Sequence, residues 1–558
     1  MSPADAIHVP VLIVGGGPTG LTLSCLLSRS GVDSLLVERN PTTCDHPQAH
    51  IVNTRSMEIM RMLGLEPAIR DEALPPSVMG HVRWVTSLTG REFASLNLAP
   101  GPREIGARLA ASPAMPVSCG QDRIEPLLAS LARKGPGRVE FSTQMVELEV
   151  ANHGITASVV SEGRQRTVRA DWLVACDGAA SPTREIVGIP MEGPGALAHV
   201  VGIYFHADLS RFVAERPAVL YWTIDDEVPG TFIAIDGRER WVFHAAWDAD
   251  RHSLAAFTNE RCIEILRRAI GTEVEIDLRS VRPWTMSAQV AERYRDRRVL
   301  LAGDAAHRFP PTGGFGMNTG LQDAHNLGWK LAAVIAGTAG DALLDSYEAE
   351  RLPVGRGNRD WSVANAMGLA SVIGPGAAQQ ARRLADAELS FEALSAEIQQ
   401  IADREVGHFS AMGRDLGFVY EDGALVSDGS RPPECENPDR NYIPSGRPGA
   451  RAPHLGIVRD GELLSILDLF EDRWVLLAAS IHAGTWRRAA AAQRVSVDCV
   501  AIGTDVLDPG DAWASLYGIE DGAVLVRPDG HVAWRSRHHV EDAEGTLRRA
   551  FGHILAND

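Results

Sequence analysis

The 558-residue sequence predicts an α/β fold with a Rossmann-type domain, a region of antiparallel strands and a small α/β domain at the C-terminus. Three observations predict it. An apolar run at 9–14 leads into a Gly-x-Gly-x-x-Gly turn, followed by a helix and a second apolar run. Residues 204–247 alternate apolar with polar side chains, which is typical of antiparallel strands. Beyond a proline-rich linker at 432–448, strands and helices alternate again.

Composition excludes several classes of protein. A hydrophobic content of 45% and a charged content of 23% are those of an ordinary globular protein. The formal net charge of -18 makes nucleic acid and anionic membrane surfaces poor partners, and the apolar runs are too short to predict a membrane span. The seven cysteines are scattered without CxxC or metal-ligand spacing, so we expect reduced thiols, no metal site and a cytoplasmic location.

The first motif is the turn at Gly15, Gly17 and Gly20, which also contains Pro18 and Thr19. Each glycine has a physical role: a tight turn, close approach of the backbone to a pyrophosphate, and close packing of helix on strand. Glu38 ends the second strand 18 residues beyond the last glycine, where a carboxylate can accept hydrogen bonds from a ribose. The pattern predicts dinucleotide binding; the alternative is a tight turn that binds nothing.

Two further strands end in an acid beside a glycine. The apolar segment 171–176 runs into Asp177-Gly178, and a helix follows. The segment 299–302 runs into Gly303-Asp304, then through a Gly- and Pro-rich turn into a helix over 321–331. Glycines at 313, 314 and 316 remove the Cβ atoms that would keep a flat ligand from the backbone. The alternatives are a helix-capping aspartate for the first and a helix entry that needs glycine for the second.

Aromatic residues are concentrated in the region of alternating strands. Four of the 12 tryptophans lie between 222 and 284. An aromatic-lined substrate pocket is one interpretation, with Trp222, Phe232 and Trp241 as its wall, judged by strand alternation alone. A plain sandwich core explains the same residues about as well.

The three motifs in this order closely resemble the para-hydroxybenzoate hydroxylase family, which are FAD-dependent aromatic monooxygenases, over residues 8–360. The stretch AHIVNTRSMEIMRMLGL at 49–65 resembles the phenol and 2-hydroxybiphenyl hydroxylases and the aromatic polyketide hydroxylases. Residues 522–530 are similar to their C-terminal thioredoxin-like domain. Because this chain has no CxxC motif, we expect no thiol–disulfide exchange there, but a structural role or a contact in a homodimer. The domains expected are 1–185 and 291–430 for FAD, 186–290 for substrate, and 431–558 for the thioredoxin-like part.

The resemblance implies roles for particular residues. The first turn would hold the FAD pyrophosphate, Glu38 the adenosine ribose, and the segment after Pro310 the isoalloxazine ring. The cofactor-binding residues implied are Gly15, Gly17, Pro18, Thr19, Gly20, Glu38, Arg39, Gln48, Gln121, Asp177, Gly178, Gly303, Asp304, Pro311, Gly314, Gly316, Met317 and Asn318.

The catalytic residues implied are His50, Pro310 and Pro311, and the sequence departs from the family beside them. Gln48 stands where related hydroxylases have a flavin-contacting arginine, and Ser118 aligns with an aspartate that partners the histidine. His50 is therefore either the base that activates a phenol or a structural histidine.

The activity implied is hydroxylation of a phenolic or polycyclic aromatic substrate by O₂, through a flavin C4a-hydroperoxide, with NADH or NADPH as transient reductant. One alternative is a flavin enzyme of the same fold that oxidises or reduces without inserting oxygen. Another is a scaffold whose flavin site is vestigial. The sequence leaves open the aromatic substrate, the position attacked and the choice between NADH and NADPH.

Overall fold

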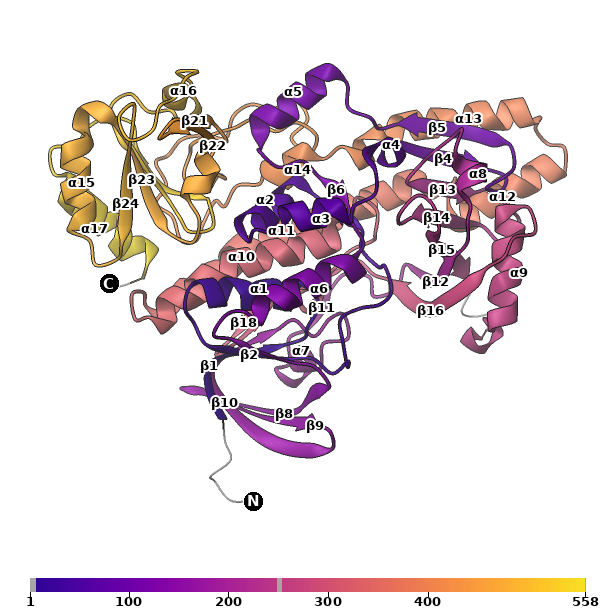
Figure 1. Cartoon of the computed structure of the whole chain (residues 1–558), viewed down its shortest axis with the longest axis horizontal. Coiled ribbons are helices and arrows are strands. Elements are labelled where there is room, and N and C mark those ends of the chain that lie inside the picture. Colours follow the sequence, from indigo (N-terminus) through magenta and orange to yellow (C-terminus); the bar gives the residue numbers. More distant parts are fainter. Residues whose placement is uncertain (1–6, 248–252, 557–558) are drawn as a thin grey trace.

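The computed structural model describes residues 7–247 and 253–556, which form a Rossmann-type domain, a second sheet beneath a set of helices, and a C-terminal domain (Figure 1). The first sheet is parallel at its centre, where β1 pairs with β10 and β2, and β10 pairs with β19. In spatial order its strands are β18 (Arg295–Asp296), β19 (Val299–Leu301), β10 (Arg164–Ala175), β1 (Ile7–Val14), β2 (Ser34–Val37) and β7 (Arg138–Glu140).

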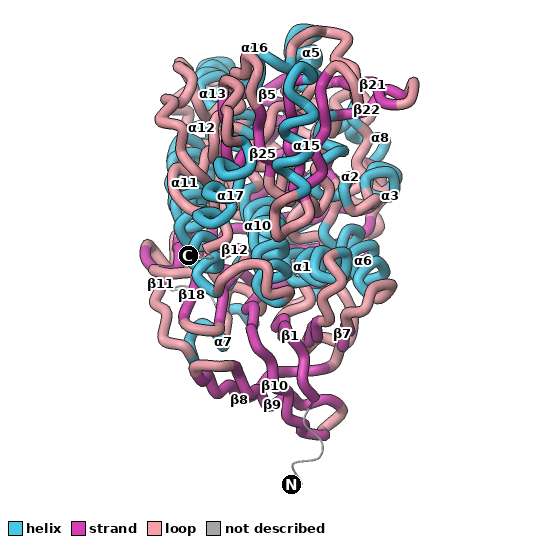
Figure 2. Tube along the Cα trace, turned by 90° about the vertical axis from the view of Figure 1, so that its left-hand side faces the viewer, coloured by secondary structure: helices cyan, strands magenta, loops and turns pink. Residues whose placement is uncertain are grey.

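Two helices cover one face of this sheet and carry the glycine-rich turns. Helix α1 (Pro18–Arg29) connects β1 to β2, and α10 (Phe315–Ile335) packs along it (Figure 1). Strand β2 is buried along its whole length, as expected for a parallel strand that is covered on both faces. The antiparallel strands β8 (Thr143–Ala151) and β9 (Gly154–Ser161) extend β10 at the end of the molecule near the N-terminus (Figure 2).

The second sheet is antiparallel except where β13 pairs with β4. Its order is β16 (Asp277–Met286), β12 (Ala198–His206), β15 (Arg240–Trp247), β14 (Gly230–Ala234), β13 (Leu220–Thr223), β4 (His81–Val85) and β5 (Glu92–Asn97). The last two strands come from 81–97, within the segment expected to belong to the FAD domain. The chain therefore leaves the first sheet after β2 to form these two strands and returns to the first sheet at β7.

Helices from 345 to 404 complete this part of the molecule. They are α11 (Asp345–Leu369), α12 (Gly374–Ala385) and α13 (Phe391–Arg404). Helix α13 lies on β5, where Gln399 exchanges two hydrogen bonds with the backbone of Ser95 and Phe391 stacks on Phe93. Along the described residues, no helix combines the length and the apolar content needed to cross a bilayer.

The C-terminal domain has the strand order of the thioredoxin-like fold that was expected. Strand β23 (Trp474–Ala479) lies between β24 (Val497–Ile502), which is parallel to it, and β25 (Ala523–Val526), which is antiparallel. Strand β26 (Val532–Ser536) completes the sheet, and helices α15 (Ala483–Ala491) and α17 (Ala543–Ile554) pack beside each other. All seven cysteines of the chain are unpaired.

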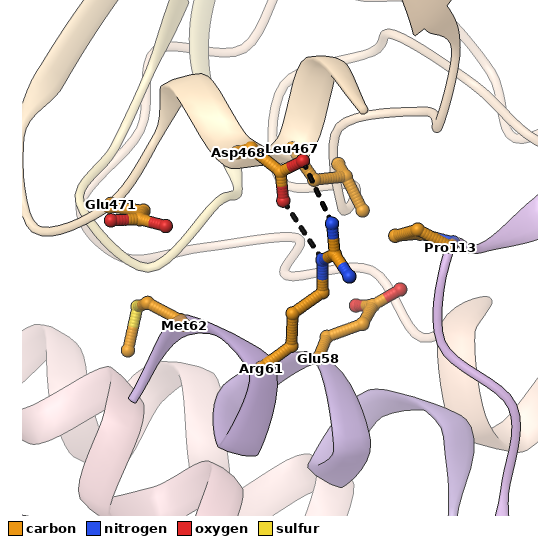
Figure 3. Close-up of a pocket in the computed structure, with 7 residues that line it drawn as sticks. All are labelled: Glu58, Arg61, Met62, Pro113, Leu467, Asp468 and Glu471. Atoms are coloured by element: carbon orange, nitrogen blue, oxygen red, sulfur yellow. Dashed lines mark hydrogen bonds and ion pairs between the residues drawn. The ribbon is translucent and has the colours of Figure 1, made fainter. Parts of the chain in front are cut away.

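The C-terminal domain contacts the nucleotide-binding domain through charged side chains. Figure 3 shows Arg61 of α2 (Thr54–Met62) reaching both carboxylate oxygens of Asp468, at 3.0 and 3.1 Å. A cavity of about 30 Å³ beside this pair has room for about one water molecule. Nearby, Arg451 contacts the buried carboxylate of Glu58, also on α2. Helix α2 is thereby fixed to both domains.

Candidate active site

The glycines of the first turn have different surroundings. A Cβ at Gly20 would lie 2.1 Å from the carbonyl oxygen of Gly15, so this glycine is required for the turn itself. A Cβ at Gly17 would meet no protein atom within 4 Å. Gly17 is the N-cap of α1 and provides no side-chain cap, so the first N–H groups of the helix point into open space. Space beside unpaired helix N–H groups suits an anionic ligand.

Glu38 lies beside this turn. One carboxylate oxygen accepts a hydrogen bond of 2.6 Å from the backbone N–H of Gly16, and the other accepts one of 2.8 Å from that of Asn40. The carboxylate is therefore fixed at the carboxyl end of β2, where the fold places a ribose contact. The side chain of Arg39 is exposed beside it.

The third motif packs directly on the first. Gly303 has a φ of 62°, and a Cβ there would lie 2.6 Å from Oγ1 of Thr19. Its N–H donates to Asp323 of α10 at 3.2 Å, which joins the turn to the helix. Asp304 retains exposed surface, yet burial raises the pKa of its carboxyl. Asp304 is therefore accessible, yet surrounded by enough protein to disfavour its charged form.

Asp177 of the second motif is used within its own turn. Its carboxylate accepts hydrogen bonds from the hydroxyl of Ser181 at 2.5 Å and from the N–H and hydroxyl of Thr183 at 3.0 and 2.6 Å. These contacts fix the start of α7 (Pro182–Ile186), which is the structural alternative considered for this residue. Gly178 has a φ of 82°, and a Cβ there would meet no protein atom within 4 Å.

At the start of α10, no side chain caps the backbone N–H groups, whereas the side chain of Asn318 is hydrogen-bonded. Gly314 is the N-cap in a left-handed conformation, at φ 70°, and a Cβ at Gly316 would meet nothing within 4 Å. The side chain of Asn318 is fully engaged, because it donates to the carbonyls of Ile51 and Gly314 and accepts from the N–H of Asn53. Of the other predicted residues here, Pro310 and Met317 are buried and Pro311 is exposed. Asn318 positions the turn, and the backbone N–H groups are left for a ligand.

His50 is paired with Ser118. Its Nδ1 lies 2.9 Å from the hydroxyl of Ser118, where the short strands β3 (Ile51–Val52) and β6 (Val117–Ser118) pair. Burial lowers the pKa of His50 to about 4, so the imidazole is neutral at physiological pH. Like Asp304, the ring keeps some exposed surface. His50 is therefore a partly accessible, neutral imidazole with Nδ1 held by Ser118.

The two predicted glutamines lie close to this pair. The backbone N–H of Gln121 donates to the carbonyl of Ala49 at 2.8 Å, and its side chain donates to buried Glu125 at 2.6 Å. Gln48 is exposed, and its amide lies 3.6 Å from Sγ of Cys44. Both glutamines are thus at the junction between the two sheets.

Comparison with known proteins decides the family. Residues 8–362 match the family model described as FAD binding domain, and residues 445–557 match that of aromatic-ring hydroxylase, C-terminal. A putative polyketide hydroxylase of Streptomyces halstedii is 39% identical over 575 residues, covering 99% of this chain and 98% of the relative. The tetracenomycin A2 monooxygenase-dioxygenase of Streptomyces glaucescens is 38% identical, covering 98% and 97%.

The chain belongs to the FAD-dependent aromatic monooxygenases. A crystal structure of the flavin-dependent monooxygenase PieE in complex with FAD and substrate has a TM-score of 0.91 and 34% identity, with each chain covered over its whole length. The family and fold class expected from the three motifs are confirmed.

The geometry of this monooxygenase fits FAD. The open space at Gly17 and the free N–H groups of α1 suit a pyrophosphate, and Glu38 is placed for a ribose. The uncapped start of α10 offers N–H groups that can stabilise negative charge on a reduced ring. The residue assignments remain predictions, which the variants described below test.

The strand register corrects part of the predicted substrate wall. Phe232 is paired with Phe243, and Trp241 lies two residues away on β15, so both side chains share one face of the sheet. His244 and Trp222 have the opposite parity and point to the other face. Phe232 and Trp241 are fully buried in the core cluster that includes Leu266 of α9 (Asn259–Ile270), which lies on the far side of the sheet from α10 (Figure 1). The three residues predicted to form one wall therefore do not share one face of the sheet.

Two histidines that reasoning from sequence missed lie on the inner face of the sheet. His46 is buried with Nδ1 2.7 Å from the hydroxyl of Ser280 on β16, and His244 of β15 lies edge-on to Trp284. The available signal was the sequence DHPQAH at 45–50, in which His46 precedes His50 by four residues. His244 carried no local signal, because only the register shows which face it occupies.

Proposed function

We propose that this monooxygenase hydroxylates a phenolic ring of a polycyclic aromatic substrate, consuming O₂ and NADH or NADPH. The observation that carries the proposal is the partly accessible, neutral His50, whose Nδ1 is held by Ser118. The names of the Streptomyces relatives, a polyketide hydroxylase and a tetracenomycin A2 monooxygenase-dioxygenase, support a polycyclic substrate over a single ring.

The residues of the chain have defined tasks in this proposal. The free nitrogen of His50 accepts the proton of the substrate hydroxyl, which makes the ring carbon more nucleophilic. Ser118 fixes the orientation of the imidazole through Nδ1. The protein around Asp304 and His50 excludes water from the reacting groups. Bound FAD supplies electron transfer from NAD(P)H and activation of O₂.

The reductant docks transiently in this proposal. The sequence has no second Gly-x-Gly-x-x-Gly turn that stands out for a nicotinamide nucleotide. NADH and NADPH are distinguished by comparing the rate of flavin reduction with each. A homodimer and a cytoplasmic location also remain predictions, which light scattering of the purified protein and cell fractionation address.

Incorporation of ¹⁸O tests the proposal. The FAD-loaded enzyme is incubated with NAD(P)H, ¹⁸O₂ and phenols of one, two and three fused rings, and each product is weighed by mass spectrometry. We expect substrate-stimulated NAD(P)H consumption and one ¹⁸O atom in the product, with the highest kcat/KM for a fused-ring phenol. Stimulated NAD(P)H consumption without ¹⁸O in any product would instead support an enzyme that acts without inserting oxygen.

A further inference from the structure

His244 has an imidazole without a hydrogen-bond partner among the described residues. Its position on β15, opposite Gly202 and Thr231, directs the ring to the same face of the sheet as Trp222. The ring keeps partial exposure, while burial, followed by the neighbouring His46 and His50, lowers its pKa to about 3. The ring is therefore neutral and partly accessible, on the same face of the sheet as Trp222.

The surroundings of His244 form a built site. A Cβ at Gly202 would lie 3.3 Å from Nε2 of His46 and 3.6 Å from Cδ2 of His244, so the two rings are neighbours over the one position in this strand without a side chain. The hydroxyl of Ser280 fixes the other nitrogen of His46 at 2.7 Å. Trp284 packs edge-on against His244 with 5.5 Å between ring centroids. The ring of His244 is thus held by packing while its polar atoms stay free.

His244 and His50 come from different parts of the chain, and His50 lies close enough to contribute to the lowered pKa of His244. His50 precedes β3 in the nucleotide-binding domain, whereas His244 belongs to the second sheet. The nearby cations are already paired, because Arg282 donates to Asp45 and Arg240 contacts Asp122 of α6 (Gln121–Ala132). Among the described residues, neutral imidazoles rather than free guanidinium groups are therefore the polar groups beside His244.

We propose that His244 contacts the substrate and hydrogen-bonds a second oxygen, on the edge of the aromatic system away from the hydroxyl at His50. The proposal rests on the proposed function and names its substrate class: an uncharged fused-ring phenol with a second hydroxyl or carbonyl. A neutral imidazole offers one donor and one acceptor, so it serves either group. Among the described residues, a carboxylate at this position would find no unpaired cation. His46, which is the neighbour of His244 over Gly202, is a positioning residue.

Two naphthols that differ by one oxygen test the proposal. The FAD-loaded wild type and its His244→Phe and His244→Gln variants are titrated with 1-naphthol and 1,5-dihydroxynaphthalene, following bound-flavin absorbance for Kd and NAD(P)H consumption for kcat/KM. His199→Phe is the matched control, because His199 is on the same sheet but has the opposite parity in β12. Circular dichroism establishes whether each variant is folded. His244→Gln is included in case the larger phenylalanine ring is not accommodated, because glutamine can still donate and accept a hydrogen bond.

We expect wild type and His199→Phe to bind the dihydroxy compound about tenfold more tightly, as one added hydrogen bond gives. In His244→Phe the ratio of the two Kd values should fall to about one, and in His244→Gln part of the preference should remain. An equal affinity of wild type for both naphthols, or a preference that survives in His244→Phe, overturns the assignment of His244. Absence of any hydroxylated product from either naphthol with wild type counts instead against the proposed function.

Discussion

Glu350 of α11 and Arg527 of the C-terminal domain form a two-point ion pair, at 2.7 and 2.9 Å, with both side chains fully buried. Lys330 of α10 also donates to Glu350, at 2.8 Å. Burial alone would raise the pKa of Glu350, but Arg527 and Lys330 lower it to about 2. Since α10 begins at the candidate flavin site, this pair fixes the C-terminal domain to the helix that forms the site.

Removing one member of this pair should destabilise the protein strongly. Arg527→Ala leaves the Glu350 carboxylate buried with one cation fewer, and we expect a loss of about 3 to 5 kcal/mol in the free energy of unfolding. Urea denaturation measures it. Arg473→Ala, at an exposed pair with Asp498, is the control and should cost about 0 to 1 kcal/mol. Equal losses in the two variants would contradict a structural role for the buried pair.

Asp415 of α14 (Met412–Leu416) should make the folded protein less stable as pH rises, which is the reverse of the usual effect of an aspartate. Burial raises its pKa to about 7, although Asn53 donates a hydrogen bond of 2.8 Å to it. Because the folded-state pKa lies above the unfolded value, the folded protein binds the extra proton and this contribution is lost as pH rises from about 4 to 7.

An asparagine at position 415 cannot ionise, so the Asp415→Asn variant should not lose this stability as pH rises. Relative to wild type, its free energy of unfolding should increase from pH 5 to pH 7 and then level off, as measured by urea denaturation at each pH. Exposed Asp386→Asn serves as the control. A difference between Asp415→Asn and wild type that stays constant across these pH values would exclude a raised pKa.

His50→Gln should lower kcat by about 100-fold, since a general base contributes on this order. The same change should increase the H₂O₂ released per NAD(P)H consumed, because the substrate is no longer activated. His153→Gln, at an exposed turn, provides the control. Unchanged kcat and unchanged H₂O₂ release would show that His50 is a structural histidine.

The partner of His50 should determine the pH profile. With a pKa of about 4, His50 remains a base down to that pH, and kcat/KM should fall only as pH decreases through about 4. Ser118→Asp places a carboxylate beside Nδ1, where opposite charge favours the imidazolium and raises the pKa by about 1 to 3 units. In Ser118→Asp, the fall of kcat/KM at low pH should therefore occur at a higher pH than in wild type. If it occurs at the same pH, the pKa of His50 does not determine it.

Local contacts explain which features could be predicted from sequence. The first turn could be predicted because Gly20 packs on the carbonyl of Gly15, and Glu38 accepts from the N–H of Gly16, all within one βαβ unit. The wall of the substrate space could not, because alternation gives a period of two without stating which face is inward. Phe232 and Trp222 were predicted to share one wall, but the register places them on opposite faces of the sheet. The contact between His46 and His244 depends on Gly202 in a third segment, which no local pattern reveals.

FAD titration of Gly17→Ala tests the central claim most directly, namely that the turns enclose a single FAD. Gly106→Ala is a matched control, because a Cβ would meet no protein atom within 4 Å at either glycine. Both variants should fold, and Gly106→Ala should bind FAD like wild type. Gly17→Ala should bind FAD at least about tenfold more weakly, since its methyl group occupies the space of the pyrophosphate. Unchanged FAD affinity in Gly17→Ala would contradict the site.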